Sequence, residues 1–295
     1  LVASGAAAAW GLAGWPLATA SAADAPRRRV LFFTKSAGFQ HSVINRGDDE
    51  LAHAEKILIE VGKRNNVDVV ATKDGTVFDS DLDQFDAFAF YTTGDLTKEG
   101  TDKAPPMSAD GKKRLLDAVA AGKGLIGSHC ASDTFHTEGP GWENQATPDP
   151  YIAMLGGEFI SHGAQQKARL VLTGHGFPGA DSLAEDFELN EEWYSLKNLA
   201  DDMHVILVQD TQGMEGVMYE RPPYPATWAR RHGDGRVFYT SMGHREDVWT
   251  NPSFQGLLTG ALAWTTGNVE FEPTANLEKV CPGAHVMPVP KRRSA

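Results

Sequence analysis

The chain has 295 residues, of which 41% are hydrophobic and 22% are charged, as in ordinary globular proteins. This length fits one large α/β domain better than two small ones. The formal net charge is -12 and the lysines and arginines form no stripe. Nucleic acid and anionic membranes are therefore poor partners, because both bind preferentially to clustered positive charge.

The first 25 residues differ from the rest of the chain. Residues 1–23 carry no charge and end in small residues that offer Ala-x-Ala cleavage sites. The pattern predicts that residues 1–25 are a signal peptide whose basic leader is missing, with a membrane anchor as the less favoured alternative. We therefore expect a bacterial protein that is exported to the periplasm or secreted.

Apolar runs typical of buried strands alternate with segments of helical periodicity. Strands are predicted at residues 30–34, 67–71, 85–91, 124–128, 168–172, 204–208 and 236–241, and helices at 51–61, 108–121 and 252–264. This order predicts an α/β domain over residues 27–272, with a mostly parallel sheet and helices on both faces. Residues 273–295 lack periodicity and are predicted to be an extended tail.

Polar residues follow four of these strands directly. In parallel sheets, ligands bind beyond the carboxyl ends of the strands, so such residues are candidates for a site. They are His41 after the first strand, Asp95 after the third, His129 and Asp133 after the fourth, and His244 after the last.

His129 lies in Gly127-Ser128-His129-Cys130-Ala131, a strand-to-helix turn that exposes its central side chain as a nucleophile elbow does. The alternative is a histidine buried against the next helix. Asp133 could act as a base, bind a sugar hydroxyl or orient His129, and it could equally cap the following turn.

Cys130 could form a Cys-His-Glu triad with His244 and Glu246, as in class I glutamine amidotransferases. The register argues against this triad, because the exposed position of the turn belongs to His129. We expect Cys130 to be a small buried thiol. Two cysteines make no disulfide framework, and whether Cys130 pairs with Cys281 is left open.

Two further segments carry polar groups beside aromatic or glycine residues. His162 follows Gly156-Gly157, which permits close approach of the backbone to a ligand. Glu191 and Glu192 precede Trp193 and Tyr194. Because successive residues face different sides, we expect one of the two glutamates to enter the site.

A metal site is one possible use of these groups. His129, His244 and a glutamate such as Glu191 could bind a divalent ion, zinc being the example, or the two histidines could form an acid–base pair. His41 is a further candidate ligand. The sequence contains no H-E-x-x-H motif, no Walker A loop and no G-x-G-x-x-G fingerprint.

Six ordered motifs, spread from about Val30 to Gly267, together resemble the trehalose-utilisation (ThuA-like) family. They are Gly38-Phe39-Gln40-His41, residues 127–135, Gly156-Gly157-x-Phe159-x-x-His162, Glu191-Glu192-x-Tyr194, Pro225-Ala226-Thr227-Trp228, and residues 235–240 with Gly243-His244. The resemblance implies a flavodoxin-like fold similar to that of class I glutamine amidotransferases, without their glutaminase triad. It also implies catabolism of disaccharides such as trehalose, acting on 3-keto sugars made by a partner sugar dehydrogenase.

The leading hypothesis is an enzyme that acts on a keto-sugar or glycoside by acid–base or metal-assisted chemistry, ending in hydrolysis, elimination or isomerisation. Catalytic roles fall to His129, His244, Glu191, Glu192 and Asp133, and substrate contacts to His41, Asp95, His162, Trp142, Tyr194, Trp228 and Trp249. The alternatives are a non-catalytic carbohydrate-binding module, which needs the aromatics alone, and a hydrolase or amidotransferase that uses Cys130.

Overall fold

The computed structural model describes residues 27–289, so the predicted signal peptide lies outside the described residues. The described chain is built around a nine-stranded sheet with the strand order β2-β1-β3-β4-β11-β10-β9-β6-β7. A separate two-stranded sheet pairs β5 (Glu158–His162) with β8 (Tyr194–Lys197). The predicted α/β class is confirmed.

Five strands at one end of the large sheet run parallel to one another. They are β2 (Val67–Thr72), β1 (Arg28–Phe33), β3 (Ala87–Phe90), β4 (Gly124–Ser128) and β11 (Gly235–Thr240). β3 and β4 are buried throughout, because helices cover both faces of this half. Each of these strands was predicted, since uninterrupted apolar runs are the signature of such burial.

The other four strands join in antiparallel pairs. They are β10 (Tyr224–His232), β9 (His204–Asp210), β6 (Gln166–Leu172) and β7 (Asp186–Glu191). β7, at the edge, is exposed or partly buried at every residue before its last, Glu191, so it lacks the apolar run that revealed the central strands. β5, β7, β8 and β10 were not predicted.

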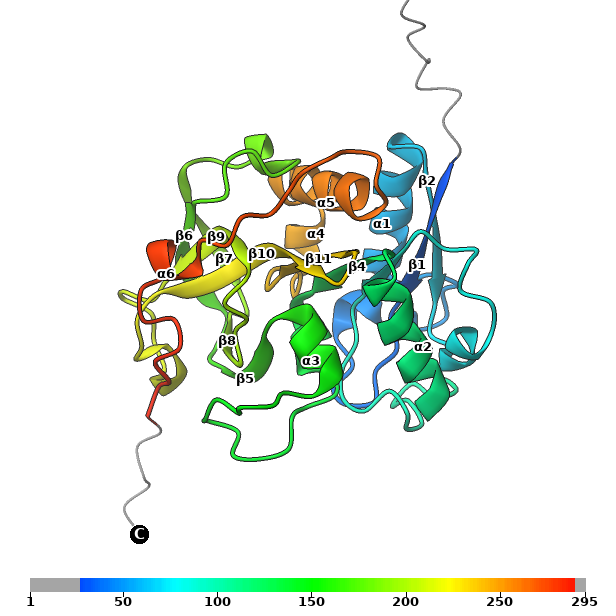
Figure 1. The fold of residues 1–295 in the computed structure, drawn as a ribbon, viewed down its shortest axis with the longest axis horizontal. Helices are drawn as coiled ribbons and strands as arrows, with labels where there is room; N and C mark the ends of the chain where they lie inside the picture. Colours follow the sequence, from blue (N-terminus) through cyan, green and yellow to red (C-terminus); the bar gives the residue numbers. More distant parts are fainter. Residues whose placement is uncertain (1–26, 290–295) are drawn as a thin grey trace, which may run out of the picture.

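Helices cover the parallel half on both sides (Figure 1). α1 (His53–Arg64), α4 (Glu246–Trp249) and α5 (Pro252–Thr265) lie on one side, and α2 (Ala109–Ala120) and α3 (Pro150–Leu155) lie on the other. Ser108 caps α2, because its hydroxyl accepts a hydrogen bond from the backbone N–H of Gly111. Short 3-10 turns complete the described elements: η1 (Ser42–Ile44), η2 (Gly75–Asp79), η3 (His129–Asp133), η4 (Ala180–Ser182) and η5 (Val217–Tyr219).

The described part of the predicted extended tail is not extended throughout. It forms the short helix α6 (Leu277–Val280), and Leu277, Cys281 and Ala284 are buried. The buried guanidinium of Arg221 donates a hydrogen bond to the carbonyl of Ala284, which fastens this segment to the domain. Sequence periodicity missed the segment because one helical turn is too short to show a period.

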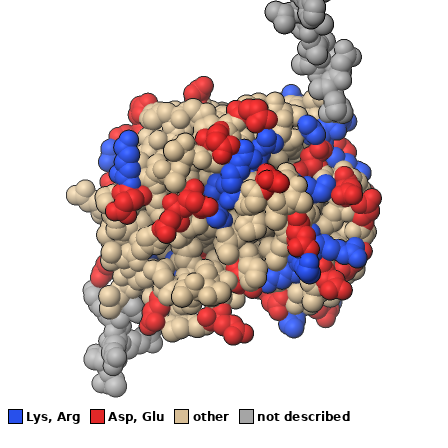
Figure 2. Space-filling model, in the orientation of Figure 1, with Lys and Arg blue, Asp and Glu red and all other residues tan. Residues whose placement is uncertain are grey.

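The surface agrees with the charge pattern of the sequence. Acidic and basic side chains are interspersed on the face drawn in Figure 2. Among residues 27–289, none of the helices is both long enough and apolar enough to cross a membrane.

Candidate metal centre

Four side chains from separate parts of the chain meet beyond the carboxyl ends of the parallel strands. They are His41, His129, Glu192 and His244, and one ligand-type atom of each lies within 4.8 Å of those of the others. His41 follows β1, His129 begins η3 after β4, and His244 follows β11. The rule that parallel sheets bind ligands at this edge therefore located all three histidines.

Glu192 is the group around which the histidines gather. Its Oε2 lies 3.0 Å from Nδ1 of His244, 3.6 Å from Nε2 of His129 and 4.0 Å from Nε2 of His41. Its Oε1 lies 3.2 Å from Nδ1 of His162, an exposed ring at the rim. Burial would raise the pKa of Glu192, but its interactions with His129 and His244 hold that pKa below the usual value. The carboxylate is therefore ionised.

Two buried ring nitrogens that face Glu192, Nε2 of His129 and Nδ1 of His244, make no hydrogen bond among the described residues. In His41 the unpartnered nitrogen is Nδ1, whereas Nε2 faces Glu192 and lies 3.4 Å from the hydroxyl of Tyr194. Buried polar atoms are nearly always paired, so this concentration calls for a missing partner. Burial, with the neighbouring His129 and His244, lowers the pKa of His41 to about 2. His41 is thus neutral and keeps a free lone pair, as metal ligation requires.

A hydrogen bond to the backbone and a left-handed conformation fix the ring of His129. Nδ1 of His129 donates a hydrogen bond to the carbonyl of Ser241 at 2.9 Å, which leaves the lone pair on Nε2 facing Glu192. His129 has a φ of 46°, a left-handed conformation that is uncommon for a residue with a side chain. The turn does not expose His129 as predicted, because the residue is fully buried, but its ring is directed to the cluster.

Glu191 supports the cluster from behind and does not join it. It is fully buried, and its Oε2 accepts hydrogen bonds from the backbone N–H groups of Gly243 at 2.9 Å and His244 at 3.2 Å. Its Oε1 accepts another from the N–H of Glu192. The predicted metal set of His129, His244 and Glu191 is therefore corrected: Glu192 is the carboxylate of the cluster, and His41 is its fourth member. As expected from alternation, one of the two glutamates enters.

Two buried rings hold the loop that carries His244. The hydroxyl of Tyr91 and Nε1 of Trp249 both donate to the carbonyl of Gly243, at 3.0 and 2.7 Å. Gly243 has a φ of 122°, which side chains rarely permit. The loop is therefore fixed from three sides, by Glu191, Tyr91 and Trp249.

A cavity of about 280 Å³ opens beside the cluster. Its walls combine aromatic rings with titratable groups: Phe39, His41, Asp133, Phe159, His162, Glu192 and Tyr194. Phe39 is unusual because its ring is 68% exposed, and it meets His41 edge-on at 5.0 Å. An exposed aromatic ring beside polar groups suits the apolar face of a sugar.

Several predicted contacts lie elsewhere. Trp228 and Trp249 are fully buried, so neither presents a ring face to a ligand; Nε1 of Trp228 donates to the carbonyl of Leu155. Trp142 is partly exposed but does not line the cavity. Asp95 is exposed, accepts hydrogen bonds from Thr97 and lines a neighbouring hollow. Phe39 and Phe159 line the cavity but were not predicted as contacts, although both stand in the motifs quoted above.

Cys130 is fully buried, and burial raises the pKa of its thiol well above the usual value. A nucleophilic cysteine needs the opposite, an accessible thiolate of low pKa. Cys130 and Cys281 are both free. The structure thus disfavours the Cys130 hydrolase hypothesis.

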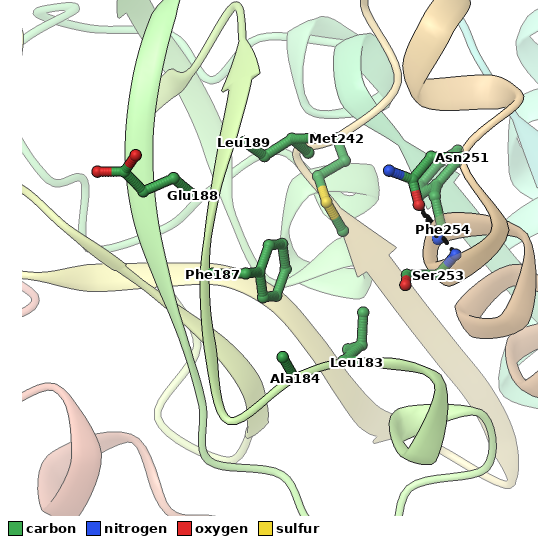
Figure 3. A pocket seen from close by; sticks show the side chains of 9 residues that line it. All are labelled: Leu183, Ala184, Phe187, Glu188, Leu189, Met242, Asn251, Ser253 and Phe254. Atoms are coloured by element: carbon green, nitrogen blue, oxygen red, sulfur yellow. Dashed lines mark hydrogen bonds between the residues drawn. The ribbon is translucent and has the colours of Figure 1, made fainter.

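A smaller hollow of about 220 Å³ lies between β7 and the start of α5 (Figure 3). Apolar side chains such as Phe187, Leu189 and Met242 surround it, and the carboxylate of Glu188 points away from it. The polar group of Asn251 is used to cap α5. This hollow has no cluster of titratable groups, so it is not a candidate catalytic site.

Comparison with known proteins agrees with this architecture. A putative ThuA-like protein from Bacteroides uniformis superposes with a TM-score of 0.61 at 17% identity, over 88% of this chain and 98% of that one. A second from Parabacteroides merdae gives 0.55 at 16% identity, over 87% and 97%. A cytoplasmic protein from Salmonella typhimurium LT2 gives 0.51 at 15% identity, over 82% and 100%. At these identities the likeness shows the fold alone.

Comparison with individually curated protein sequences gives no match. The model of the ThuA family, described as trehalose utilisation, matches residues 29–265, and this range contains the whole cluster and every wall of the cavity. The chain therefore belongs to the ThuA, or trehalose-utilisation, family.

Proposed function

We propose that this protein is a sugar-catabolic enzyme whose centre is a divalent metal ion held by His41, His129, Glu192 and His244. The observation that carries the proposal is the convergence of three imidazoles on one ionised carboxylate, where the facing nitrogens of His129 and His244 make no hydrogen bond among the described residues. Imidazole with one carboxylate is a donor set that suits zinc. The family description supports sugar metabolism.

The cavity supports a sugar ring as the ligand. Phe39 and Phe159 offer ring faces, while His162 and Asp133 offer polar atoms for hydroxyl groups. A bound divalent ion would act as a Lewis acid that polarises a carbonyl oxygen and acidifies the neighbouring C–H. A keto-sugar, such as a 3-keto glycoside formed by a sugar dehydrogenase, presents such a carbonyl.

The roles of the protein groups follow from their positions. Asp133 lines the cavity and is the candidate for proton transfer, and His162, at the rim and 3.2 Å from Glu192, is the candidate for binding a hydroxyl. The shared first step would remove a proton next to the carbonyl, after which hydrolysis, elimination or isomerisation could follow. We further propose, from residues 1–25, that the enzyme is exported.

The test uses methyl 3-keto-glucoside and zinc-loaded protein, with turnover followed by NMR. Wild-type protein should convert the probe, and Glu192→Gln should abolish the conversion. Glu188→Gln is the matched control, since Glu188 is an exposed carboxylate on β7 that pairs with Lys167. No turnover of keto-sugars by the wild type, together with sugar binding that survives loss of both His129 and His244, would instead favour a carbohydrate-binding module.

A further inference from the structure

A second group of charged residues adjoins the cavity and has no part in the metal cluster. His136 lies between two carboxylates: its Nε2 is 2.7 Å from Oδ1 of Asp133, and its Nδ1 is 3.2 Å from Oε1 of Glu158. Asp133 ends η3, the turn that His129 begins, and it lines the cavity. The contact with His136 engages Oδ1, which leaves the second oxygen for a ligand.

Glu158 is anchored far more firmly than a surface ion pair requires. It is 1% exposed, and it also accepts hydrogen bonds from the backbone N–H of Thr137 and from Nδ2 of Asn198. The ammonium of Lys197, itself 2% exposed, lies 3.4 Å away. Burying a carboxylate and an ammonium carries a desolvation cost that their contacts must offset. Such a network, built behind one half-exposed histidine, indicates more than a surface contact.

The backbone also presents His136 in a fixed place. Phe135 has a φ of 53°, again left-handed, and its ring packs edge-on against Tyr151 at 5.5 Å. The ammonium of Lys112 lies 3.9 Å above the same ring. These contacts hold the turn that sets His136 between its two carboxylates.

We infer that His136, anchored by buried Glu158, is a positioning residue that holds the carboxylate of Asp133 toward the cavity, where Asp133 is the base that removes the proton beside the substrate carbonyl. The inference rests on the proposed function. The arrangement reverses that of a serine protease triad, since the histidine here orients a carboxylate. The interactions with Asp133 and Glu158 raise the pKa of His136 to about 9, so the ring is a cation at neutral pH.

The proton transfer balances without another reactant. Asp133 takes the proton, the C–H electron pair forms a carbon–carbon double bond, and the carbonyl pair moves to its oxygen. The carboxylic acid then returns the proton to the same carbon, or to the glycosidic oxygen as the C–O bond breaks with its electron pair. The first outcome exchanges hydrogen with solvent, and the second releases an alcohol.

The experiment measures deuterium incorporation into methyl 3-keto-glucoside in D2O, with metal content determined on the same samples. His136→Gln should lower kcat by about tenfold to a hundredfold with KM and metal content unchanged, and Asp133→Asn should lower it by about a hundredfold or more. Imidazole in solution should restore part of the rate of His136→Ala, because the native ring is 46% exposed. The control is His175→Gln, which removes a similar but exposed pair with Glu185.

The pH profile gives a readout that a merely structural role would not move. The other titratable groups facing His136 are Asp133 and Glu158, with Asp95, Lys112 and Asp149 around the adjoining hollow. The wild-type rate should fall as pH rises through about 9, and His136→Gln should lack that fall. A His136→Gln enzyme with the wild-type kcat and pH profile would overturn this inference but leave the proposed function standing. A wild type without metal or exchange would overturn the proposed function, and the inference with it.

Discussion

The carboxylate of Glu191 accepts a hydrogen bond from the backbone N–H of His244, 53 residues further along the chain, at 3.2 Å. Through its other oxygen it holds the N–H of Glu192. One buried side chain thus fixes the backbone of two members of the candidate metal centre without reaching the metal position itself.

This relationship predicts the effect of Glu191→Gln. The amide keeps the size of the side chain but replaces one acceptor oxygen by a donor, so the backbone of Glu192 or His244 must shift. Such outer-shell changes typically weaken metal binding by about tenfold to a hundredfold. The measurement is zinc affinity by competition with a chelator, with Glu188→Gln as the control. Wild-type affinity in Glu191→Gln would show that the loop holds its position without this carboxylate.

Phe39→Ala tests the sugar-stacking surface. The exposed ring lines the cavity, and an aromatic contact contributes about 0.5–1.5 kcal/mol, so sugar affinity should fall by about two- to tenfold. Zinc content should be unchanged, because Phe39 contributes no ligand atom. The readout is the dissociation constant for methyl 3-keto-glucoside by calorimetry. Trp142→Ala is the control. An equal loss of sugar affinity in both variants would argue against Phe39 as a sugar-binding surface.

The His136–Glu158 pair predicts a pH dependence of stability. Because the pKa of His136 is raised from 6.5 to about 9, its contribution is complete below pH 6.5 and is lost as pH rises through about 9. Because the interactions with His136, Thr137 and Asn198 outweigh burial and lower the pKa of Glu158 from 4.5 to about 2, its contribution is complete above pH 4.5 and is lost as pH falls toward 2.

The Tm difference between wild type and His136→Gln should therefore be largest between pH 4.5 and 6.5 and should shrink above pH 9. The measurement is thermal unfolding across this pH range at constant ionic strength. A difference that grows above pH 9 would reverse the assigned protonation of the pair.

Cys130→Ala tests whether the thiol has a chemical role. Cys130 is fully buried with a raised pKa, so the variant should keep its turnover and zinc content. The folded wild type should also resist alkylation at Cys130, whereas both cysteines should react in denaturant. Loss of turnover in a folded, zinc-loaded Cys130→Ala protein would restore the thiol as a candidate nucleophile.

The sequence predicted the parts of the molecule that follow from periodicity and strand order. Apolar runs located the central strands, and the rule for parallel sheets led to His41, His129 and His244. Alternation showed that one of Glu191 and Glu192 enters, but it could not say which, because that depends on how β7 ends against the loop of Gly243.

The remaining misses have a common physical cause. Tryptophan is a residue type that often stacks on sugars, which is why Trp228 and Trp249 were predicted to contact the substrate. Large apolar rings also pack in cores, and packing between distant elements buries both of these rings. Asp133 lies only three residues before His136, but the buried partner that anchors the ring, Glu158, lies 22 residues away on another element. Local patterns carry no information about such pairs.

The most direct test of the central claim is the metal content of the purified, zinc-incubated and dialysed protein, measured by mass spectrometry of the elements. The account predicts about one zinc per chain in the wild type and in Glu188→Gln, and little in His129→Ala and Glu192→Gln. A wild-type protein that stays free of metal after incubation with zinc, manganese and other divalent ions would contradict it and leave the histidines as acid–base or binding groups.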